Sequence, residues 1–481
     1  MLLIWLLPAF QSLRPFTVIG PLDGDIQLNP DVHWNPQLWF NGSYSKQKTA
    51  YLNDQFGFRN IFVRLRNQIN YSFFRKPTAS DVVIGKNGFL YEEKYIKAYT
   101  GKDFIGESTI LELLKKAKYI ADTLKKLNID LVLLYAPGKA TFYPEYIPEH
   151  YFIGSDTLHT NYKYFVKLSK QLGLNYLDFN ALFKIQKKTT SFPLYPKTGT
   201  HWSIYSMHYA FDTLVNYIQV LKQRQLSKFK YDSVEWSYDM KTPDDDIAKG
   251  LNTLFPIPAF KMAYPVIQFK DTLGKYRPRV LTVSDSYWMG IYCTFLPKTI
   301  LKNHEFWYYY QKNMDYSGQE NDPLDLNLKN EVENKDILLI MASEASLADF
   351  GWGIIDDLYN LYSKGEKGLN HRSRKIILER MKRKIRSNED WMADVHRKAQ
   401  LNTISVDSMI TLDAIWAIRD DESLKKKYQE KPDFKEIRVI KNKMLKNDKW
   451  MEIITKKARN QNVSVDSMMT IDANWMINPE K

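Results

Sequence analysis

Apolar runs that alternate with amphipathic stretches dominate the chain from residue 108 to residue 342. Continuous apolar runs are typical of buried strands, whereas apolar residues spaced three and four apart are typical of helices. Strands of this kind separated by helices predict an α/β domain, in which a mostly parallel sheet is covered by helices on both faces. The pattern predicts helices at 108–127, with Ser108 as N-cap, at 162–172 and at 205–221, and strands at 129–135, 174–179, 279–283 and 336–342.

Two short apolar runs that read as a hairpin precede this region. Residues 82–84 and 89–91 are joined by Lys86, Asn87 and Gly88, a combination that favours a tight turn. Upstream, residues 16–80 are rich in proline, asparagine and aromatic residues, with helical spacing near their end. We expect 16–80 to be an N-terminal segment packed on the main domain, which we place at 81–365.

The last part of the chain contains an internal repeat. Residues 385–418 match residues 444–477 without a gap, and the match includes the pairs Trp391/Trp450 and Trp416/Trp475. Each copy reads as two or three short helices within an all-α region at 371–481, with Ser405 and Ser464 as helix N-caps. We interpret the repeated tryptophans as core anchors; contacts to a sugar or to a partner are the alternative.

The net charge of the 481-residue chain is +13, and most of this excess lies in the repeat region. Residues 371–481 hold 25 Lys and Arg against 17 Asp and Glu, interleaved with apolar residues at helical spacing. This arrangement is typical of solvated helix faces, so we predict no nucleic-acid partner. An anionic polysaccharide or lipid headgroups are the alternative partners for this charge.

Composition narrows the chemistry further. A single cysteine excludes an internal disulfide framework. The sequence has no HExxH or CxxC pattern, so we predict no metal and no cofactor. Residues 1–10 are apolar but too few to span a bilayer, which needs about 20. We interpret residues 1–15 either as a short core segment or as the trailing part of a signal peptide or membrane anchor.

A serine and a histidine carry the candidate chemistry. Ser286 follows the predicted strand 279–283, where a buried strand would deliver it to the edge of the sheet. His201 lies in a polar, turn-rich segment that precedes a predicted helix. A serine hydroxyl becomes a nucleophile when an imidazole accepts its proton, so the pair predicts acyl transfer through Ser286, with its own backbone N–H as one oxyanion-hole donor.

The ordered motifs resemble those of a known family. Gly85–Tyr91, Ala136–Lys139, Thr200–Ser203 and Asp285–Trp288 occur in the order found in SGNH-hydrolase-like proteins of the alginate O-acetyltransferase (AlgX/AlgJ) type. The resemblance implies a flavodoxin-like SGNH fold with circularly permuted motifs and matches Ser286 to the nucleophile and His201 to the base. It also implies a polysaccharide substrate, a membrane-bound O-acyltransferase that supplies acetyl groups, and a periplasmic location or one at the outer face of the cytoplasmic membrane, with peripheral or anchored association.

The chain departs from this family where the acidic residue is expected. That residue stands two positions before the histidine, which is Gly199 here, and Ser284 replaces a glycine before Asp285. Three explanations remain open: a backbone carbonyl orients His201, an acid from elsewhere does so, or the site is inactive. Glu344, after the strand at 336–342, and Asp246 are the candidate acids. Asp285 is less suitable because neighbouring residues on an extended chain point to opposite sides.

Two functions follow from these alternatives. The first is acetyl transfer to or from hydroxyls of an exported polysaccharide, as an O-acetyltransferase or an acetyl esterase. The second is a catalytically inactive polysaccharide-binding or assembly protein. Lys139, Trp202 and Tyr287 are the candidate substrate-binding residues, because each lies beside a motif residue.

Overall fold

The chain forms two compact units, Met1–Ile355 and Asp356–Lys481. The computed structural model describes residues 8, 10–12, 19–24, 28–270, 274–318, 320–323, 326–365, 372–386, 388–402, 404–421, 441, 444–445, 447–460, 465, 468–469 and 472–473. The apolar stretch 1–10 and the predicted cap Ser464 therefore lie largely or wholly outside the described residues. The limits that we expect for the domains from the sequence remain predictions.

A seven-stranded sheet forms the centre of the first unit, in the order β10-β9-β8-β7-β11-β3-β4. The strands from β8 to β4 pair in parallel, and β9 and β10 extend the sheet as an antiparallel edge. The α/β class with a mostly parallel sheet is thus confirmed. The strands are β3 (Asp130–Ala136), β4 (Tyr176–Asp178), β7 (Arg279–Ser284), β8 (Lys302–Tyr308), β9 (Lys312–Met314), β10 (Glu320–Asn321) and β11 (Ile337–Ser343).

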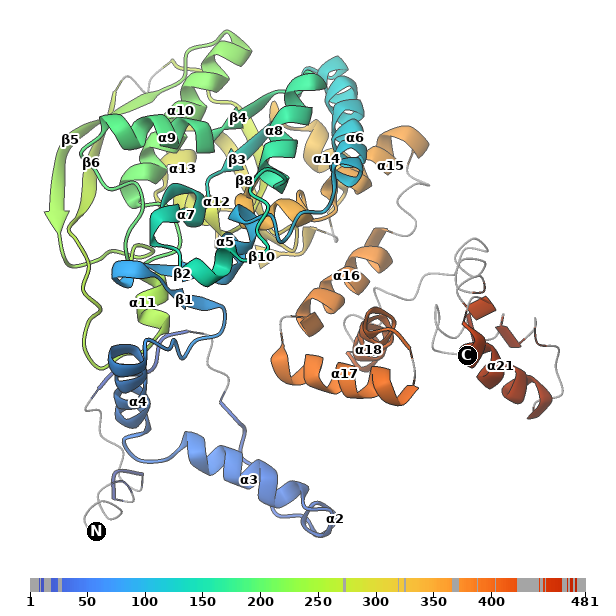
Figure 1. The fold of residues 1–481 in the computed structure, drawn as a ribbon. Coiled ribbons are helices and arrows are strands. Elements are labelled where there is room, and N and C mark those ends of the chain that lie inside the picture. Colours follow the sequence, from blue (N-terminus) through green and yellow to red (C-terminus); the bar gives the residue numbers. More distant parts are fainter. Residues whose placement is uncertain are drawn as a thin grey trace. The chain divides into compact units, whose positions relative to one another are not determined.

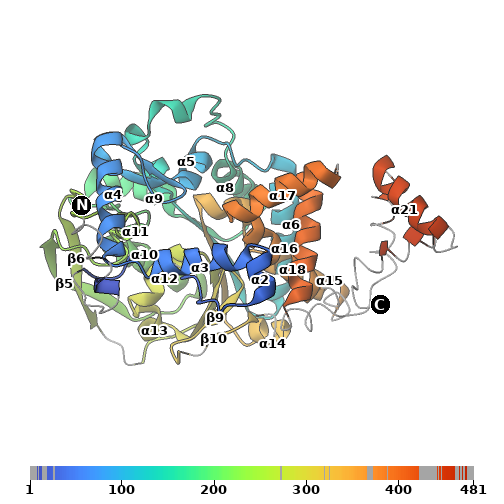
Figure 2. The same cartoon turned by 90° about the horizontal axis from the view of Figure 1, so that it is seen from below.

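Helices cover both faces of this sheet (Figures 1 and 2). Val132 of β3 belongs to the same apolar core as Phe211 of α10 (Ile204–Lys222). Tyr135 points to the opposite face, where its ring centroid lies 5.9 Å from that of Phe165 in α8 (Asn161–Gln171). The other helices of the unit are α2 (Pro36–Phe40), α3 (Ser43–Asp54), α4 (Arg59–Phe74), α5 (Glu93–Tyr99), α6 (Glu107–Lys126), α7 (Lys139–Phe142), α9 (Phe179–Thr189), α11 (Asp246–Gly250), α12 (Ser286–Cys293), α13 (Leu296–Ile300) and α14 (Leu328–Glu333).

Every helix and strand that the α/β pattern predicts is present, with small shifts at the ends. One detail is wrong: α6 begins at Glu107, and its N-cap is Gly106 rather than Ser108. The predicted hairpin is also present, as β1 (Val82–Ile84) paired with β2 (Leu90–Glu92). The sequence pattern did not indicate the antiparallel ribbon formed by β5 (Lys228–Ser237) and β6 (Met262–Lys270).

The second unit is helical where it is described. It contains α16 (Arg372–Arg386), α17 (Glu389–Asn402), α18 (Val406–Asp420) and α21 (Asp448–Asn460), and α15 (Ile354–Lys364) lies at its start. Helices α16, α17 and α18 pack on one another (Figure 1). Ser405 caps α18, because its side chain accepts a hydrogen bond from the Ser408 backbone N–H. Among the described residues, none of the helices has the length and apolar content needed to cross a membrane.

Candidate active site

Ser286 lies beyond the carboxyl end of β7, as the sequence predicted. The strand is buried from Val280 to Ser284, and α12 begins at Ser286 itself. Asp285 fixes this sharp transition: one carboxylate oxygen accepts from the Tyr287 backbone N–H at 3.1 Å, and the other accepts from the Ser343 backbone and hydroxyl at 2.9 and 2.7 Å. The Asp285 side chain is therefore occupied in holding the strand ends together.

His201 faces Ser286 across this edge. Its Nε2 lies 2.8 Å from the Ser286 hydroxyl oxygen, so the neutral imidazole accepts the hydroxyl proton. His201 precedes α10, in a segment that contacts the residues before and within α11. The structure thus brings together the two residues that the sequence singled out, although 85 positions separate them.

Asp246 supplies the acid beside His201. The His201 Nδ1–H donates to one carboxylate oxygen of Asp246 at 2.5 Å. The other oxygen accepts from the backbone N–H groups of Thr200 at 2.8 Å and Ile247 at 2.7 Å. Three donors therefore fix the carboxylate, and it holds His201 in the tautomer that leaves Nε2 free to accept a proton.

The close approach of these two segments also accounts for Gly199. A Cβ atom at this position would lie 2.7 Å from the Pro243 carbonyl oxygen and 2.8 Å from that of Asp244. Any side chain there would displace the backbone that leads to Asp246. The family carries its acid two positions before the histidine. In this chain, the acid beside the histidine is instead Asp246, the first residue of α11.

Glu344 does not contact His201. Its carboxylate is buried and accepts from the Thr141 hydroxyl at 2.5 Å and from the Asn180 side-chain amide. Burial raises the pKa of Glu344 to about 7, against the smaller lowering effect of these hydrogen bonds. Of the two candidate acids, the geometry therefore selects Asp246.

Lys139 is fully buried and does not form part of an open surface. Its Nζ donates to the carbonyl oxygens of Leu90, Lys197 and Gly199 at 2.7, 2.9 and 2.7 Å. Burial lowers the pKa of Lys139 to about 7. This position does not support the expected contact between Lys139 and a substrate. Instead, the Lys139 hydrogen bonds connect β2 with the segment that precedes His201.

Trp202 and Tyr287 are likewise fully buried, behind the pair of reacting side chains. Their ring centroids lie 5.1 Å apart, and the Tyr287 ring lies 5.2 Å from that of His201. The Tyr287 hydroxyl donates to the Thr200 carbonyl oxygen at 3.2 Å. These aromatic side chains support His201 from within the core and have no exposed surface to offer a substrate.

The sequence analysis did not single out Tyr309, although its hydroxyl lies near Ser286, whose side chain and backbone act to lower the pKa of the phenol. Tyr309 follows β8 with a φ of 51°, in the left-handed region that a bulky residue rarely adopts. Burial raises the pKa of Tyr309 to about 12, so the phenol stays protonated at neutral pH.

The protonation of His201 is set by opposing effects. Burial alone would lower the pKa of the imidazole, but the hydrogen bond and charge of Asp246, aided by Glu92 and Asp285, raise it above the ordinary value. The charged imidazole is therefore stabilised, as a base that accepts a proton in a transition state requires.

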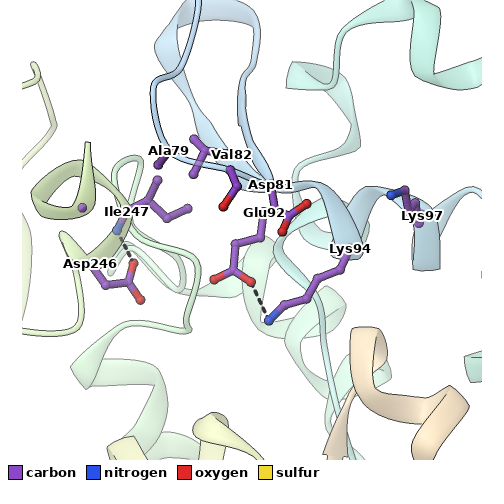
Figure 3. Close-up of a pocket in the computed structure, with 10 residues that line it drawn as sticks. Ala79, Asp81, Val82, Glu92, Lys94, Lys97, Asp246 and Ile247 are labelled. Carbon is purple, nitrogen blue, oxygen red and sulfur yellow. Dashed lines mark hydrogen bonds and ion pairs between the residues drawn. The ribbon is translucent and has the colours of Figure 1, made fainter. Parts of the chain in front are cut away.

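A cavity of about 470 Å³ adjoins Asp246 (Figure 3). Val82 and Ile247 give it apolar walls, while Asp81, Glu92 and Lys94 give it polar ones. Lys94 pairs with Glu92 at 2.6 Å, and Glu92 contributes to the raised pKa of His201. The volume lies within the range of small-molecule sites, about 300–1,000 Å³, and the lining mixes apolar surface with a few polar groups. The described residues contain no group of histidine, cysteine and acidic side chains that could hold a metal ion.

The hydrogen-bonded series Asp246, His201 and Ser286 at the carboxyl edge of a parallel sheet is the arrangement of serine hydrolases and acyltransferases. Residues 82–242 match the model of the family described as the SGNH hydrolase-like domain of acetyltransferase AlgX. The match covers about a third of the chain, and this segment is similar to that AlgX-type family. His201 lies within the matched residues, whereas Asp246 and Ser286 lie beyond them.

Several solved structures resemble the chain. The O-acetyltransferase domain of Pseudomonas putida AlgJ is 17% identical over 59% of this chain and 99% of its own, with a TM-score of 0.39. Pseudomonas aeruginosa AlgX is 14% identical over 57% and 67% of the two chains, with a TM-score of 0.37. Bacillus cereus PatB1 is 12% identical over 55% and 96%, with a TM-score of 0.34. No curated protein matches the sequence.

Proposed function

We propose that this protein transfers an acetyl group to or from a hydroxyl of an exported polysaccharide through an acetyl-Ser286 intermediate. The observation that carries the proposal is the hydrogen-bond series from Asp246 through His201 to the Ser286 hydroxyl. The AlgX-type family match supports acetyl as the group transferred and a polysaccharide as the substrate class.

The first half of the reaction forms the intermediate. The Ser286 oxygen attacks the carbonyl carbon of an acetyl ester, and His201 Nε2 accepts the hydroxyl proton. The tetrahedral intermediate then collapses, and its ester oxygen leaves as an alcohol with the proton from His201. Asp246 remains ionised and stabilises the imidazolium in between.

The second half runs the same steps in reverse with a new alcohol. A sugar hydroxyl gives its proton to His201 Nε2 and attacks the acetyl carbonyl, and the Ser286 oxygen leaves with that proton. The cavity beside Asp246 is our candidate for the acceptor site, because Glu92 and Lys94 offer both acceptors and donors to sugar hydroxyls. Water in place of the sugar hydroxyl would make the reaction an ester hydrolysis.

The oxyanion that forms in each half needs two donors. The Ser286 backbone N–H is one, and we assign the other to the Tyr309 hydroxyl, which lies against Ser286 and stays protonated. In this assignment, the hydroxyl moves aside as the carbonyl oxygen arrives and then donates to it.

The alternative hypothesis, a catalytically inactive polysaccharide-binding or assembly protein, loses its main support. It rested on Gly199, which leaves His201 without an acid at the family's position, yet Asp246 hydrogen-bonds to the imidazole at 2.5 Å. The AlgX-type match further leads us to propose an export-side location and a membrane-bound O-acyltransferase that supplies the acetyl groups.

Mass spectrometry of the intact protein after brief exposure to p-nitrophenyl acetate tests the proposal. We expect one acetyl group on the wild-type protein, mapped to the Ser286 peptide, absent from Ser286→Ala and lost when acceptor oligosaccharide is added. Thr299→Ala, at a partly exposed hydroxyl of α13, is the matched control and should acetylate normally. An unmodified wild-type protein without turnover would refute the proposal.

A further inference from the structure

A surface pocket of about 740 Å³ lies in the first C-terminal repeat, between α17 and α18. Its lining includes Trp391, Lys398, Asp413, Trp416 and Asp420. Trp416 is 42% exposed, although tryptophan residues are highly buried on average. The expectation that the repeated tryptophans are core anchors therefore does not hold for Trp416.

The floor of this pocket is a fixed polar cluster. Trp391 Nε1–H donates to Asp413 at 3.1 Å, and Lys398 Nζ donates to the same carboxylate at 3.1 and 3.2 Å. Asp413 is nearly fully buried, so these bonds also serve to neutralise and hold it. Lys398 Nζ lies 5.9 Å from the Trp416 ring centroid, which joins the polar floor to the exposed wall.

The second repeat keeps the same four residue types. Trp450, Lys457, Asp472 and Trp475 occupy the positions of the four pocket residues, and Lys457 Nζ pairs with Asp472 at 3.0 Å. Trp475 lies outside the described residues. The repetition shows that the pocket composition is a feature of the repeat unit.

Among the described residues of the first copy, exposed positions other than Trp416 differ between the copies unless they lie at the start of a helix. Ala393, His396 and Gln400 are exposed in the first copy and become glutamate, threonine and arginine in the second. The exposed positions that stay identical lie at helix starts: Asn388 accepts from the Trp391 backbone N–H at 2.8 Å, Ser405 caps α18, and Asp407 lies in the first turn of α18. Trp416 lies near the end of α18, where capping cannot account for a retained surface tryptophan.

We propose that the first repeat holds a saccharide-binding site, with Trp416 as the stacking platform for a sugar ring. The apolar C–H face of a hexose packs on an aromatic ring, while carboxylates and a lysine at the rim exchange hydrogen bonds with its hydroxyls. This proposal goes beyond acetyl transfer and does not depend on Ser286.

The charged residues of the pocket determine whether it favours charged or uncharged sugars. Asp413, Asp420 and Asp421 line it together with a single lysine, so its formal charge is negative. Such a pocket repels uronic acids and accepts uncharged hexoses.

Calorimetric titration of the full-length protein tests the proposal, with β-1,4-linked glucose and mannose hexamers and an α-1,4-linked glucose hexamer as probes. We expect at least one hexamer to bind, Trp416→Ala to weaken binding at least about tenfold, and Trp416→Phe to retain most of it because a ring remains. Trp39→Ala, which removes a tryptophan of similar exposure (51%) in the first unit, is the matched control and should bind normally. Hydrolysis of p-nitrophenyl acetate should be unchanged in Trp416→Ala.

Three results would overturn the proposal. The first is that none of the hexamers binds the wild-type protein at millimolar concentration. The second is unchanged affinity in the Trp416→Ala variant, with its fold verified by circular dichroism. The third is that a mannuronate hexamer binds more tightly than every neutral one. A change of oligomeric state in Trp416→Ala, with sugar affinity unaltered, would show instead that the ring contacts protein.

Discussion

Asp246, the first residue of α11, hydrogen-bonds to His201 through Nδ1 at 2.5 Å, although the two residues lie 45 positions apart. The same carboxylate accepts from the backbone of Thr200, next to the histidine. The acid therefore fixes both the imidazole and the chain that carries it.

Asp246→Asn should reduce kcat by a factor of up to about 10⁴, because the amide favours the wrong tautomer of the imidazole. Steady-state hydrolysis of p-nitrophenyl acetate measures the effect. Glu344→Gln is the matched control: the pKa of Glu344 is raised to about 7, so glutamine mimics its protonated form and should preserve most of the activity. Equal losses in both variants would contradict the assignment of Asp246.

The dependence of kcat/KM on pH reports His201. The base must be neutral, so activity should fall as the pH decreases through a pKa that lies above the ordinary histidine value of about 6.5. In Asp246→Asn, the residual activity should persist to lower pH, since the hydrogen bond and charge that raise the pKa are gone. If kcat/KM decreased at the same pH in Asp246→Asn as in the wild-type protein, a group other than His201 would control this decrease.

Tyr309→Phe should lower kcat by about 10²–10³ with little change in KM, as expected for a lost oxyanion donor. The fold should tolerate the change, because the ring and its edge contact with Trp352 are kept. Rates from single-turnover acetylation would show the effect directly. A faster enzyme would mean that the hydroxyl obstructs the site in the wild-type protein.

Gly199→Ala should both destabilise the protein, by roughly 1–3 kcal/mol, and reduce its activity, because the new Cβ would meet backbone oxygens at 2.7 and 2.8 Å. Thermal unfolding and kcat are the measurements. Gly250→Ala is the matched control for stability, since a methyl group at that position would have no atom within 4 Å and should change stability by less than about 0.5 kcal/mol. Equal stability of the two variants would contradict close packing at Gly199.

Lys139 should make stability depend on pH. Its pKa is lowered to about 7 in the folded state from 10.5, so between these values the unfolded chain binds a proton that the native protein lacks. The free energy of unfolding should therefore rise with pH in this window, by at most about 1.4 kcal/mol per unit, and this contribution should vanish in Lys139→Met. Urea unfolding at pH 7 and pH 9 measures this dependence. An equal change of the free energy of unfolding with pH in the wild-type protein and in Lys139→Met would contradict the lowered pKa of Lys139.

The sequence was sufficient to predict four parallel strands of the sheet and to single out Ser286 and His201, which the structure places side by side. Strands β3 and β11 are buried along their whole length, and such strands appear as continuous apolar runs. Ser286 and His201 could be found because each lies directly beside such a predictable element. From the sequence, Asp246 was one of two candidate acids beside His201. Segments far apart in the sequence pack together without leaving a local sequence pattern, so the choice between the two could not be made.

Burial of aromatic residues was harder to predict. Trp202 and Tyr287 lie beside the reacting residues in sequence, yet their side chains point into the core. Tyr309 reaches Ser286 only because the chain turns after β8 with a positive φ, and no glycine or asparagine marks that turn. A position next to a motif is therefore a weak guide to what the side chain contacts.

The acid lies on the connection between the two strands of the β5–β6 ribbon, apart from the sheet that positions the nucleophile and the base. Loss or rearrangement of this single connection would leave Ser286 and His201 in the sequence while removing the residue that orients the imidazole. In related chains, the serine and histidine motifs would then be intact in active and inactive members alike. The length and acidic content of the β5–β6 connection are thus the features that would distinguish active from inactive members.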